Sequence, residues 1–186
     1  MTDKKIVLFL DRDGVLNHRI VDGYVRSWDE WTWLPGVLEA TTYFHEFAAV
    51  FVASNQQGVG KALMTEEALQ QIMTQMRAEI HAVGGKLDTY FYCPHLKGVS
   101  CECRKPAIGM ALQARKAYPE IDLKYAIMVG DSESDLLFGR NAGMKTVWIR
   151  TQPEDFLPRH LSCPIYDNLL EFAKDIPYLL DNWEHW

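Results

Sequence analysis

The chain has 186 residues, of which 48% are hydrophobic and 24% are charged, and this composition is ordinary for one compact globular domain. It excludes the disordered and collagen-like classes. The formal charge of -6 argues against a nucleic-acid partner, because binding to phosphate backbones needs a surplus of Lys and Arg. No apolar run approaches the ~20 residues that cross a bilayer, and the N-terminal apolar stretch is too short for a secretory signal. We therefore expect no membrane association and a cytoplasmic location.

Short apolar runs rich in β-forming residues alternate along the chain with helical patterns. The runs predict buried strands at residues 5–11, 48–55, 88–93, 125–131 and 145–150. The helical patterns fall at residues 35–48, 66–83, 106–118, 134–143 and 168–180. In the second of these helices, Thr65 is the expected N-cap and Gly84 the expected stop. The alternation predicts an α/β fold with a doubly wound, Rossmann-like parallel sheet, and the lack of a repeat or linker predicts a single domain over residues 1–186.

Acidic side chains stand at the ends of the first and the fourth predicted strands. Asp11 and Asp13 stand two residues apart, and Gly14 permits the tight turn that brings both carboxylates over one site. Asp131 follows the fourth strand, directly after Gly130. Ligands of open α/β sheets bind beyond the carboxyl ends of the strands, and crowded carboxylates are unfavourable without a cation. We therefore expect an open, all-oxygen Mg²⁺ site at this edge of the sheet.

Given such an ion, the side chains at this edge suit phosphoryl transfer. Asp11 can attack phosphorus and form an aspartyl-phosphate, while Asp13 protonates the leaving alkoxide and then activates water. Ser54, after the second strand, and Lys105 would hold the phosphate oxygens. Taken alone, a DxD pair is more often a solvated turn or a plain metal-binding loop, and a Ser-Asn pair after a strand is usually a turn. Their combination at successive strand ends favours the catalytic interpretation.

Three of the four cysteines lie with a histidine in one short loop. Its pattern, Cys-x-His-x5-Cys-x-Cys, offers the four ligands of a closed tetrahedral Zn²⁺ site, namely Cys93, His95, Cys101 and Cys103. A closed site leaves no position for substrate, so a structural zinc is favoured over a catalytic one. The competing interpretation is a set of buried or surface cysteines with an incidental histidine. Cys163 stands apart and is most simply a buried apolar filler.

Two cations follow this loop. Arg104 and Lys105 directly precede Pro106, which suits the first turn of the next predicted helix. Cations at a helix N-terminus oppose its dipole, so we expect an anion at the same place, although two solvated surface charges are the alternative. Because Cys103 adjoins Arg104, a bound metal would fix where the cations point.

The segments DRDGVLN, SNQQG, RKP and GDSESD, in this order, resemble the haloacid dehalogenase (HAD) superfamily of phosphohydrolases. The loop CPHLKGVSCECRKP resembles the subgroup that contains the heptose-bisphosphate and histidinol-phosphate phosphatases. The resemblance implies that Asp11 is the nucleophile and Asp13 the general acid/base, and that Asp11, the main-chain oxygen of Asp13 and Asp131 bind Mg²⁺. It further implies that Ser54 and Lys105 stabilise the phosphoryl group, and that the fold has no large cap domain.

Different segments of the sequence resemble enzymes that act on different substrates. The DGYV motif at residues 22–25 and the RKPAIGM segment favour D-glycero-D-manno-heptose 1,7-bisphosphate, from which the 7-phosphate would be removed. The compact loop, with five residues between His95 and Cys101, is closer to the histidinol type. Histidinol phosphate or another small phosphomonoester is therefore the alternative. The predicted substrate contacts are Asp22, Gly23, Tyr24, Asn55, Gln56 and Arg104.

A hypothesis of a different class is a zinc-stabilised scaffold protein that has lost catalysis. The presence of every chemical position argues against it. The sequence predicts a small phosphorylated substrate as the binding partner. It leaves the oligomeric state open, and a monomer is compatible with it.

Overall fold

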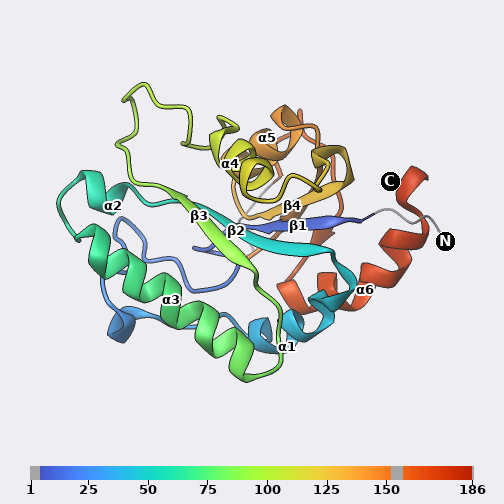
Figure 1. The fold of residues 1–186 in the computed structure, drawn as a ribbon, viewed down its shortest axis with the longest axis horizontal. Helices are drawn as coiled ribbons and strands as arrows, with labels where there is room; N and C mark the ends of the chain where they lie inside the picture. Colours follow the sequence, from blue (N-terminus) through green and yellow to red (C-terminus); the bar gives the residue numbers. More distant parts are fainter. Residues whose placement is uncertain (1–4, 152–156, 186) are drawn as a thin grey trace.

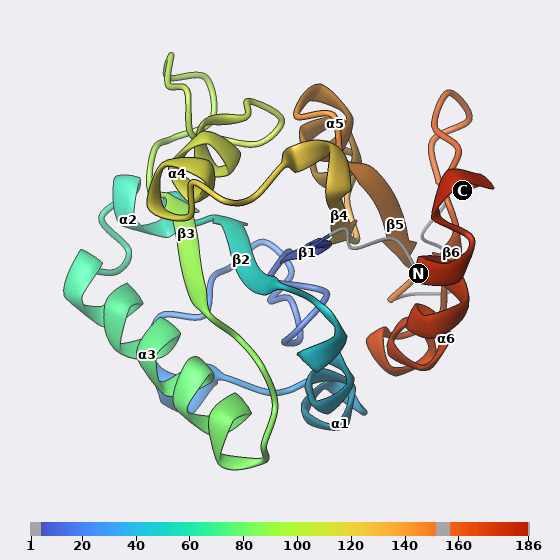
Figure 2. The same ribbon diagram turned by 45° about the vertical axis from the view of Figure 1, so that its right-hand side comes forward.

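The computed structural model describes residues 5–151 and 157–185, and in these residues it contains one six-stranded parallel sheet. The strand order is β3-β2-β1-β4-β5-β6, and Figure 2 shows the strands side by side in this order. The strands are β1 (Val7–Leu10), β2 (Ala49–Asn55), β3 (Thr89–Cys93), β4 (Ala126–Gly130), β5 (Lys145–Ile149) and β6 (Ile165–Tyr166). All five predicted strands are confirmed. The sequence did not predict β6, which has only two residues and pairs at one edge of the sheet.

Helices cover both faces of the sheet, as the doubly wound prediction requires. They are α1 (Val37–Thr42), α2 (Gln57–Gly60), α3 (Glu66–Ala82), α4 (Gly109–Ala117), α5 (Glu133–Asn141) and α6 (Leu169–Asp181), with short 3-10 turns at η1 (Trp28–Glu30), η2 (Tyr43–Glu46), η3 (Leu123–Tyr125) and η4 (Trp183–His185). In Figure 1, α1, α3 and α6 lie below the sheet, and α4 and α5 lie above it. The α/β class and the Rossmann-like layering are confirmed.

The alternation of side chains along the strands divides the core in two. Leu8 and Leu10 of β1 pack into the cluster that includes the buried residues of α1, α3 and α6. Val7 and Phe9 of the same strand pack into the cluster that includes Met110, on α4, and Phe138, on α5. Both faces of the sheet are therefore buried, which explains why the predicted strands are continuous apolar runs rather than alternating ones.

The predicted cap of α3 is confirmed, but one predicted helix start is wrong. Thr65 Oγ1 accepts a hydrogen bond from Ala68 N at 3.1 Å, as an N-cap does. The helix expected from Pro106 begins at Gly109 instead. Before it the backbone forms a turn in which Gly109 N donates to Glu102 O at 2.8 Å. Pro106 is thus outside the helix, and Arg104 and Lys105 do not flank its first turn.

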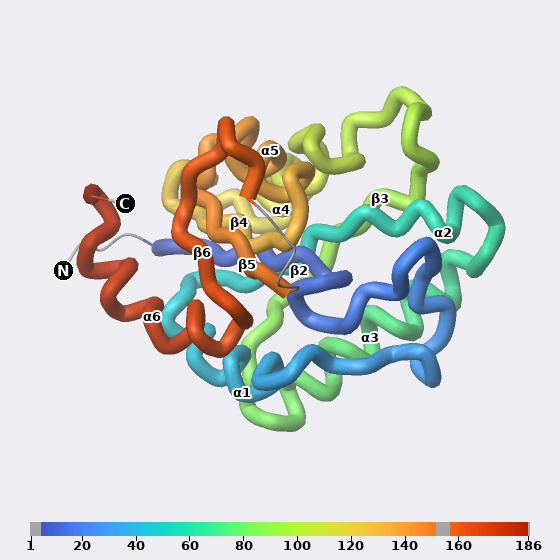
Figure 3. Tube along the Cα trace, turned by 180° about the vertical axis from the view of Figure 1, so that it is seen from behind, coloured from blue at the N-terminus to red at the C-terminus, as the bar shows by residue number. Residues whose placement is uncertain are grey.

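The ends of the strands gather the predicted polar segments at one edge of the sheet. Asp11 follows β1, Ser54 and Asn55 end β2, Cys93 ends β3, and Asp131 follows β4. The segment between β1 and α1 extends past this edge toward α2 and α3, as the view from behind shows (Figure 3). The sheet topology therefore brings together groups that are more than 100 residues apart in the sequence.

The segments that connect the strands carry helices and loops, and within the described residues none contains an inserted domain. This agrees with the expectation that there is no large cap domain. A single domain over the whole chain stays a prediction. None of the helices in the described ranges has the length and apolarity needed to cross a membrane.

Candidate active site and metal-binding clusters

Three buried carboxylates converge at the end of β1 and β4. Asp11, Asp131 and Asp135 each place a carboxylate oxygen within 4.8 Å of the others. Two glycines make this approach possible: a Cβ on Gly14, whose φ is +94°, would lie 1.9 Å from Asp131 Oδ2, and a Cβ on Gly130 would lie 2.2 Å from Asp135 Cβ. The structure therefore brings Asp11 and Asp131 together, as predicted, and adds a third carboxylate.

Asp135 is the member of this cluster that sequence reasoning missed. It lies at the third position of α5 and forms a capping box, in which its Oδ2 accepts from Ser132 N at 3.0 Å and from Ser132 Oγ at 2.6 Å. Its other carboxylate oxygen faces Lys105. The sequence feature that marks Asp135 is its spacing from Ser132 in GDSESD. That spacing indicates a helix cap and does not by itself indicate a place in an active site.

Lys105 is the buried counter-charge of the cluster. Its Nζ lies 2.7 Å from Asp11 Oδ1 and 2.5 Å from Asp135 Oδ1, and it donates to Ala53 O at 2.6 Å. Burial would lower the pKa of Lys105, but the charges of Asp11 and Asp135 outweigh burial and raise it. Lys105 is therefore a fixed cation at the carboxyl end of the sheet.

One ammonium group does not neutralise three carboxylates. Burial, followed by the charge of Asp135, raises the pKa of Asp11 to about 7. Burial and the charges of Asp11 and Asp135 raise the pKa of Asp131 well above its ordinary value. Arg19, on the loop after β1, places Nη1 3.5 Å from Asp131 Oδ2. Its charge offsets the rise in the pKa of Asp131 only in part. The cluster thus has the oxygen ligands and the uncompensated negative charge that fit Mg²⁺.

The carboxylate of Asp13 lies in a different environment from that of Asp11. Its Oδ1 accepts from Arg12 Nη2 at 2.8 Å and from Asn17 Nδ2 at 2.9 Å, and its Oδ2 accepts from Gln56 Nε2 at 2.7 Å. Burial would raise the pKa of Asp13, but the charge of Arg12 and these hydrogen bonds hold it below its ordinary value. The side chain is 25% exposed, so its carboxylate is accessible. The two aspartates of the DRDG segment are therefore electrostatically distinct.

Ser54, Asn55 and Gln56 bind protein groups around these acids. Ser54 is buried, and its Oγ accepts from Gln56 Nε2 at 2.8 Å. Asn55 holds the backbone of Lys105 at both ends, because its Oδ1 accepts from Lys105 N at 3.0 Å and its Nδ2 donates to Lys105 O at 3.2 Å. The predicted substrate contacts of Asn55 and Gln56 stay predictions, and the contacts observed here orient Lys105 and Asp13.

The other predicted substrate contacts line the loop after β1 and the loop after β3. Asp22 is exposed with a φ of +54°, and Gly23 and Tyr24 follow it half-buried. The ring of Tyr24 lies under Lys61 Nζ at 5.2 Å. From the other loop, Arg104 is half-buried and donates from Nη1 to His95 O at 3.4 Å. Their roles in binding substrate stay predictions.

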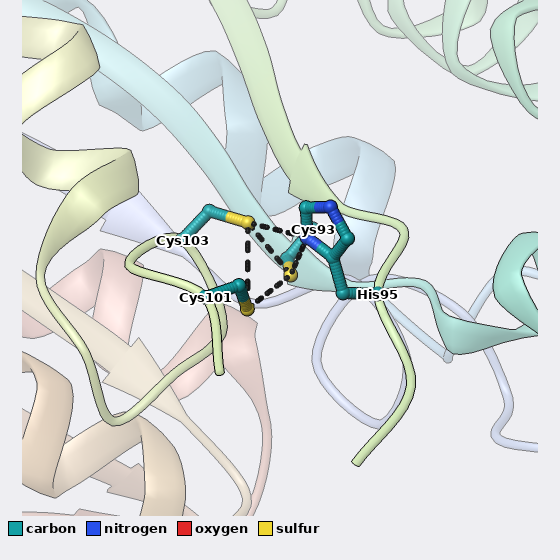
Figure 4. Close-up of side chains that lie close together, drawn as sticks. All are labelled: Cys93, His95, Cys101 and Cys103. Atoms are coloured by element: carbon teal, nitrogen blue, oxygen red, sulfur yellow. Dashed lines mark hydrogen bonds between the residues drawn. The ribbon is translucent and has the colours of Figure 1, made fainter. Parts of the chain in front are cut away.

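The sulfur and nitrogen ligands of the cysteine loop converge as predicted. Cys93, His95, Cys101 and Cys103 place one ligand atom each within 4.8 Å of one another, and Figure 4 shows their side chains pointing to a common centre. The sulfur of Cys103 lies 2.8 Å from that of Cys93 and 3.1 Å from His95 Nδ1, and the three cysteines of the cluster are free of disulfide bonds. The four ligand atoms therefore gather at one place, and the choice between a metal site and cysteines with an incidental histidine stays a prediction. Cys163 is partly buried against Trp148 and Leu136, in agreement with an apolar role.

The thiols of this cluster need a cation in order to ionise together. Burial, followed by the hydrogen bond with Cys103, raises the pKa of Cys93 to about 12. A tetrahedral metal with Zn–S bonds of about 2.3 Å separates its sulfurs by roughly 3.8 Å. The 3.7 Å between the sulfurs of Cys93 and Cys101 and the 3.9 Å between those of Cys101 and Cys103 match this separation, whereas the 2.8 Å between those of Cys93 and Cys103 is shorter. The ligand set thus fits a closed metal site.

The chain is similar to known proteins. Residues 102–159 match the family model described as HAD-hydrolase-like. The D-glycero-alpha-D-manno-heptose-1,7-bisphosphate 7-phosphatase of Mycobacterium bovis is 38% identical over 135 residues, which are 72% of this chain and 71% of that protein. The D-glycero-beta-D-manno-heptose-1,7-bisphosphate 7-phosphatase of Pseudomonas putida is 32% identical over 91% of this chain and 98% of that protein.

A solved structure gives the same result. The crystal structure of D,D-heptose 1,7-bisphosphate phosphatase from B. bronchiseptica, complexed with magnesium and phosphate, is 31% identical and superposes with a TM-score of 0.83 over 93% of this chain and 98% of that one. The chain therefore belongs to the family of HAD-like phosphatases that includes the D-glycero-D-manno-heptose-1,7-bisphosphate 7-phosphatases.

Proposed function

We propose that the protein is a Mg²⁺-dependent phosphatase that removes the 7-phosphate from D-glycero-D-manno-heptose 1,7-bisphosphate. The observation that carries this proposal is the convergence of Asp11, Asp131 and Asp135 around the buried ammonium of Lys105. The relatives that match most of the chain are named for this substrate. The names of these relatives and the acidic cluster beside Lys105 thus support the same function, the removal of a phosphate.

The proposed metal ligands are Asp11, the main-chain oxygen of Asp13, and Asp131. When bound, Mg²⁺ supplies positive charge that offsets the repulsion between the carboxylates and the substrate phosphate. Asp135 forms an ion pair with Lys105 and so holds this cation beside Asp11. Ser54 and Lys105 are proposed to stabilise the phosphoryl oxygens during transfer.

The proposed reaction has two displacements at phosphorus. In the first, a carboxylate oxygen of Asp11 bonds to phosphorus, the bond from phosphorus to the sugar oxygen breaks, and the leaving oxygen takes a proton from Asp13. In the second, Asp13 takes a proton from water, the water oxygen bonds to phosphorus, and the bond to Asp11 breaks, releasing phosphate. This division of roles rests on the resemblance of the DRDG segment to the HAD superfamily. The pKa shifts of the metal-free site do not support it, because they raise the pKa of Asp11 and lower that of Asp13.

We further propose that the cysteine loop holds a structural Zn²⁺ on Cys93, His95, Cys101 and Cys103. The support is the closed set of four ligand atoms and the raised pKa of Cys93. The free thiols of this cluster also favour the cytoplasm, where thiols stay reduced. The loop leads directly into Arg104, which is proposed to contact the substrate, and into Lys105.

The substrate is tested by comparing kcat/KM for the α and β anomers of the heptose bisphosphate with kcat/KM for histidinol phosphate. The short loop between His95 and Cys101 is the observation that favours histidinol phosphate as the second candidate. We expect one of the heptose anomers to give the highest value. A higher value for histidinol phosphate would assign the protein to that activity, and no phosphate release from any of these esters would favour a scaffold role.

A further inference from the structure

Arg12, between the two aspartates of the DRDG segment, is a charged side chain with 0% exposure. Buried charges are unfavourable unless they are paired, so such a position indicates a specific task. In the described part of the chain, its ion-pair partner is Asp13, and its Nε has no hydrogen-bond partner. The guanidinium of Arg12 is therefore paired with one carboxylate, that of Asp13.

Aromatic and sulfur groups enclose this guanidinium. The Trp31 ring lies under it, with 5.8 Å from Arg12 Cζ to the ring centroid, and Arg12 Nη1 lies 3.9 Å from Met73 Sδ on α3. Trp31 is in turn stacked on Trp28 at 5.0 Å and meets Trp33 edge-on at 4.9 Å. Trp33 Nε1 donates to Glu79 of α3 at 2.8 Å. The tryptophan-rich segment around η1 thus packs against α3 and against the guanidinium of Arg12.

The carboxylate of Asp13 is fixed by this arrangement on both oxygens. Arg12 and Asn17 donate to Oδ1, and Gln56 donates to Oδ2. A general acid or base must present its oxygen to the reacting group within hydrogen-bond reach, and a misplacement of about 1 Å reduces the rate up to ~100-fold. Rigid donors on a carboxylate that is still partly exposed satisfy this requirement.

We propose that Arg12, held in place by Trp31 and Met73, is a positioning residue that orients the carboxylate of Asp13 toward the leaving oxygen of the substrate. This inference rests on the proposed function, because it assigns Arg12 to the proton transfer of that reaction. The inference also gives a role to the tryptophan-rich segment, which packs against Arg12 and lies outside the cluster of Asp11, Asp131 and Asp135. Met in place of Arg12 keeps an apolar side chain of similar length against Trp31 but lacks the donor to Asp13.

The test compares two leaving groups in Arg12→Met and in the wild type. The parameter kcat/KM reports the steps up to leaving-group departure, and a sugar alkoxide needs protonation far more than p-nitrophenolate does. We expect Arg12→Met to lower kcat/KM for the heptose bisphosphate at least ~100-fold and kcat/KM for p-nitrophenyl phosphate less than ~10-fold. A purely structural role would lower both values by the same factor.

Two further variants and a control make the test independent of the folding of Arg12→Met. Trp31→Leu removes the ring behind the guanidinium, and Arg12→Lys keeps a charge without the planar donor; both are expected to change the ratio of the two kcat/KM values at least ~10-fold. Arg77→Met is the matched control, because Arg77 also lies over an aromatic ring, that of Tyr90 at 5.9 Å. It is expected to leave the ratio unchanged.

Equal losses on both substrates in Arg12→Lys and Trp31→Leu, or no loss in either, would overturn the inference. Failure of the wild type to release phosphate from any sugar phosphate would instead contradict the proposed function, and the inference with it. The two failures are distinguished by the wild-type measurement.

Discussion

The carboxylate of Asp11 is buried among two other acids and one ammonium group. Its pKa lies at about 7 in the folded protein without metal, against 3.8 for an ordinary aspartate. Between these pH values the folded protein retains a proton that the unfolded chain has lost. The stability that this group contributes is therefore complete below pH 3.8, decreases as the pH rises, and is gone above pH 7 or so.

This linkage predicts how Asp11→Asn changes the stability of the metal-free protein. Because asparagine does not ionise, the variant gains stability relative to wild type as the pH rises from 4 to 8, by at most roughly 4 kcal/mol from the difference between the two pKa values. Urea unfolding in the presence of a chelator measures this. Asp29→Asn, on the exposed surface of η1, is the control. A difference between wild type and Asp11→Asn that does not change with pH would contradict the assignment of the raised pKa to Asp11.

The same residues show how far a sequence can predict a site. Asp11, Asp13 and Asp131 follow predicted strands, and parallel strands end at one edge, so their proximity could be expected. The role of Asp135 could not, because its helix-cap spacing conceals its contact with Lys105. The buried position of Arg12 was also unpredictable, since it depends on Trp31 and on Met73 of α3, which are distant in the sequence.

At the scale of an element, the cysteine loop connects the cluster of Cys93, His95, Cys101 and Cys103 to the acidic cluster. Cys103, Arg104 and Lys105 are consecutive, and Asn55 holds the backbone of Lys105 against β2. The sheet and its two cores lie outside the loop. Loss of the proposed zinc should therefore displace Lys105 from Asp11 without unfolding the sheet.

We predict that Cys101→Ser lowers the bound zinc from about one ion per chain and lowers kcat at least ~10-fold, while the thermal midpoint falls by only a few degrees. Metal analysis, phosphate release and calorimetry measure the three effects. Cys163→Ser lies outside the cluster and is expected to change none of them. Global unfolding of Cys101→Ser at room temperature would show instead that the loop stabilises the whole fold.

Element boundaries were less predictable than element types. The five predicted strands form, because short continuous apolar runs can be buried on both faces of a sheet. The start of α4 shifts from Pro106 to Gly109, because the hydrogen bonds of Asn55 to Lys105 and of Gly109 to Glu102 favour a turn before the helix. The two-residue strand β6 has too little sequence to form a pattern.

At the scale of the molecule, the order β3-β2-β1-β4-β5-β6 places β1 at the centre of the sheet, with β2 and β4 as its neighbours. The ends of these three strands supply Asp11, Ser54 and Asp131, and the loop after β3 supplies Lys105. In the described residues no inserted domain covers this edge. We propose that selectivity for the substrate comes from the loops that surround this edge, which contain Asp22, Tyr24 and Arg104.

In the proposed reaction, Asp11 carries the phosphoryl group during turnover. The direct measurement is to quench the wild type with acid during hydrolysis of the heptose bisphosphate in the presence of Mg²⁺, and to locate the phosphoryl group by mass spectrometry of the peptides. We predict that it is found on Asp11, and that Asp11→Asn neither retains it nor releases phosphate at a measurable rate. Phosphate release by Asp11→Asn at a near wild-type rate, or a phosphoryl group on another residue, would contradict the account.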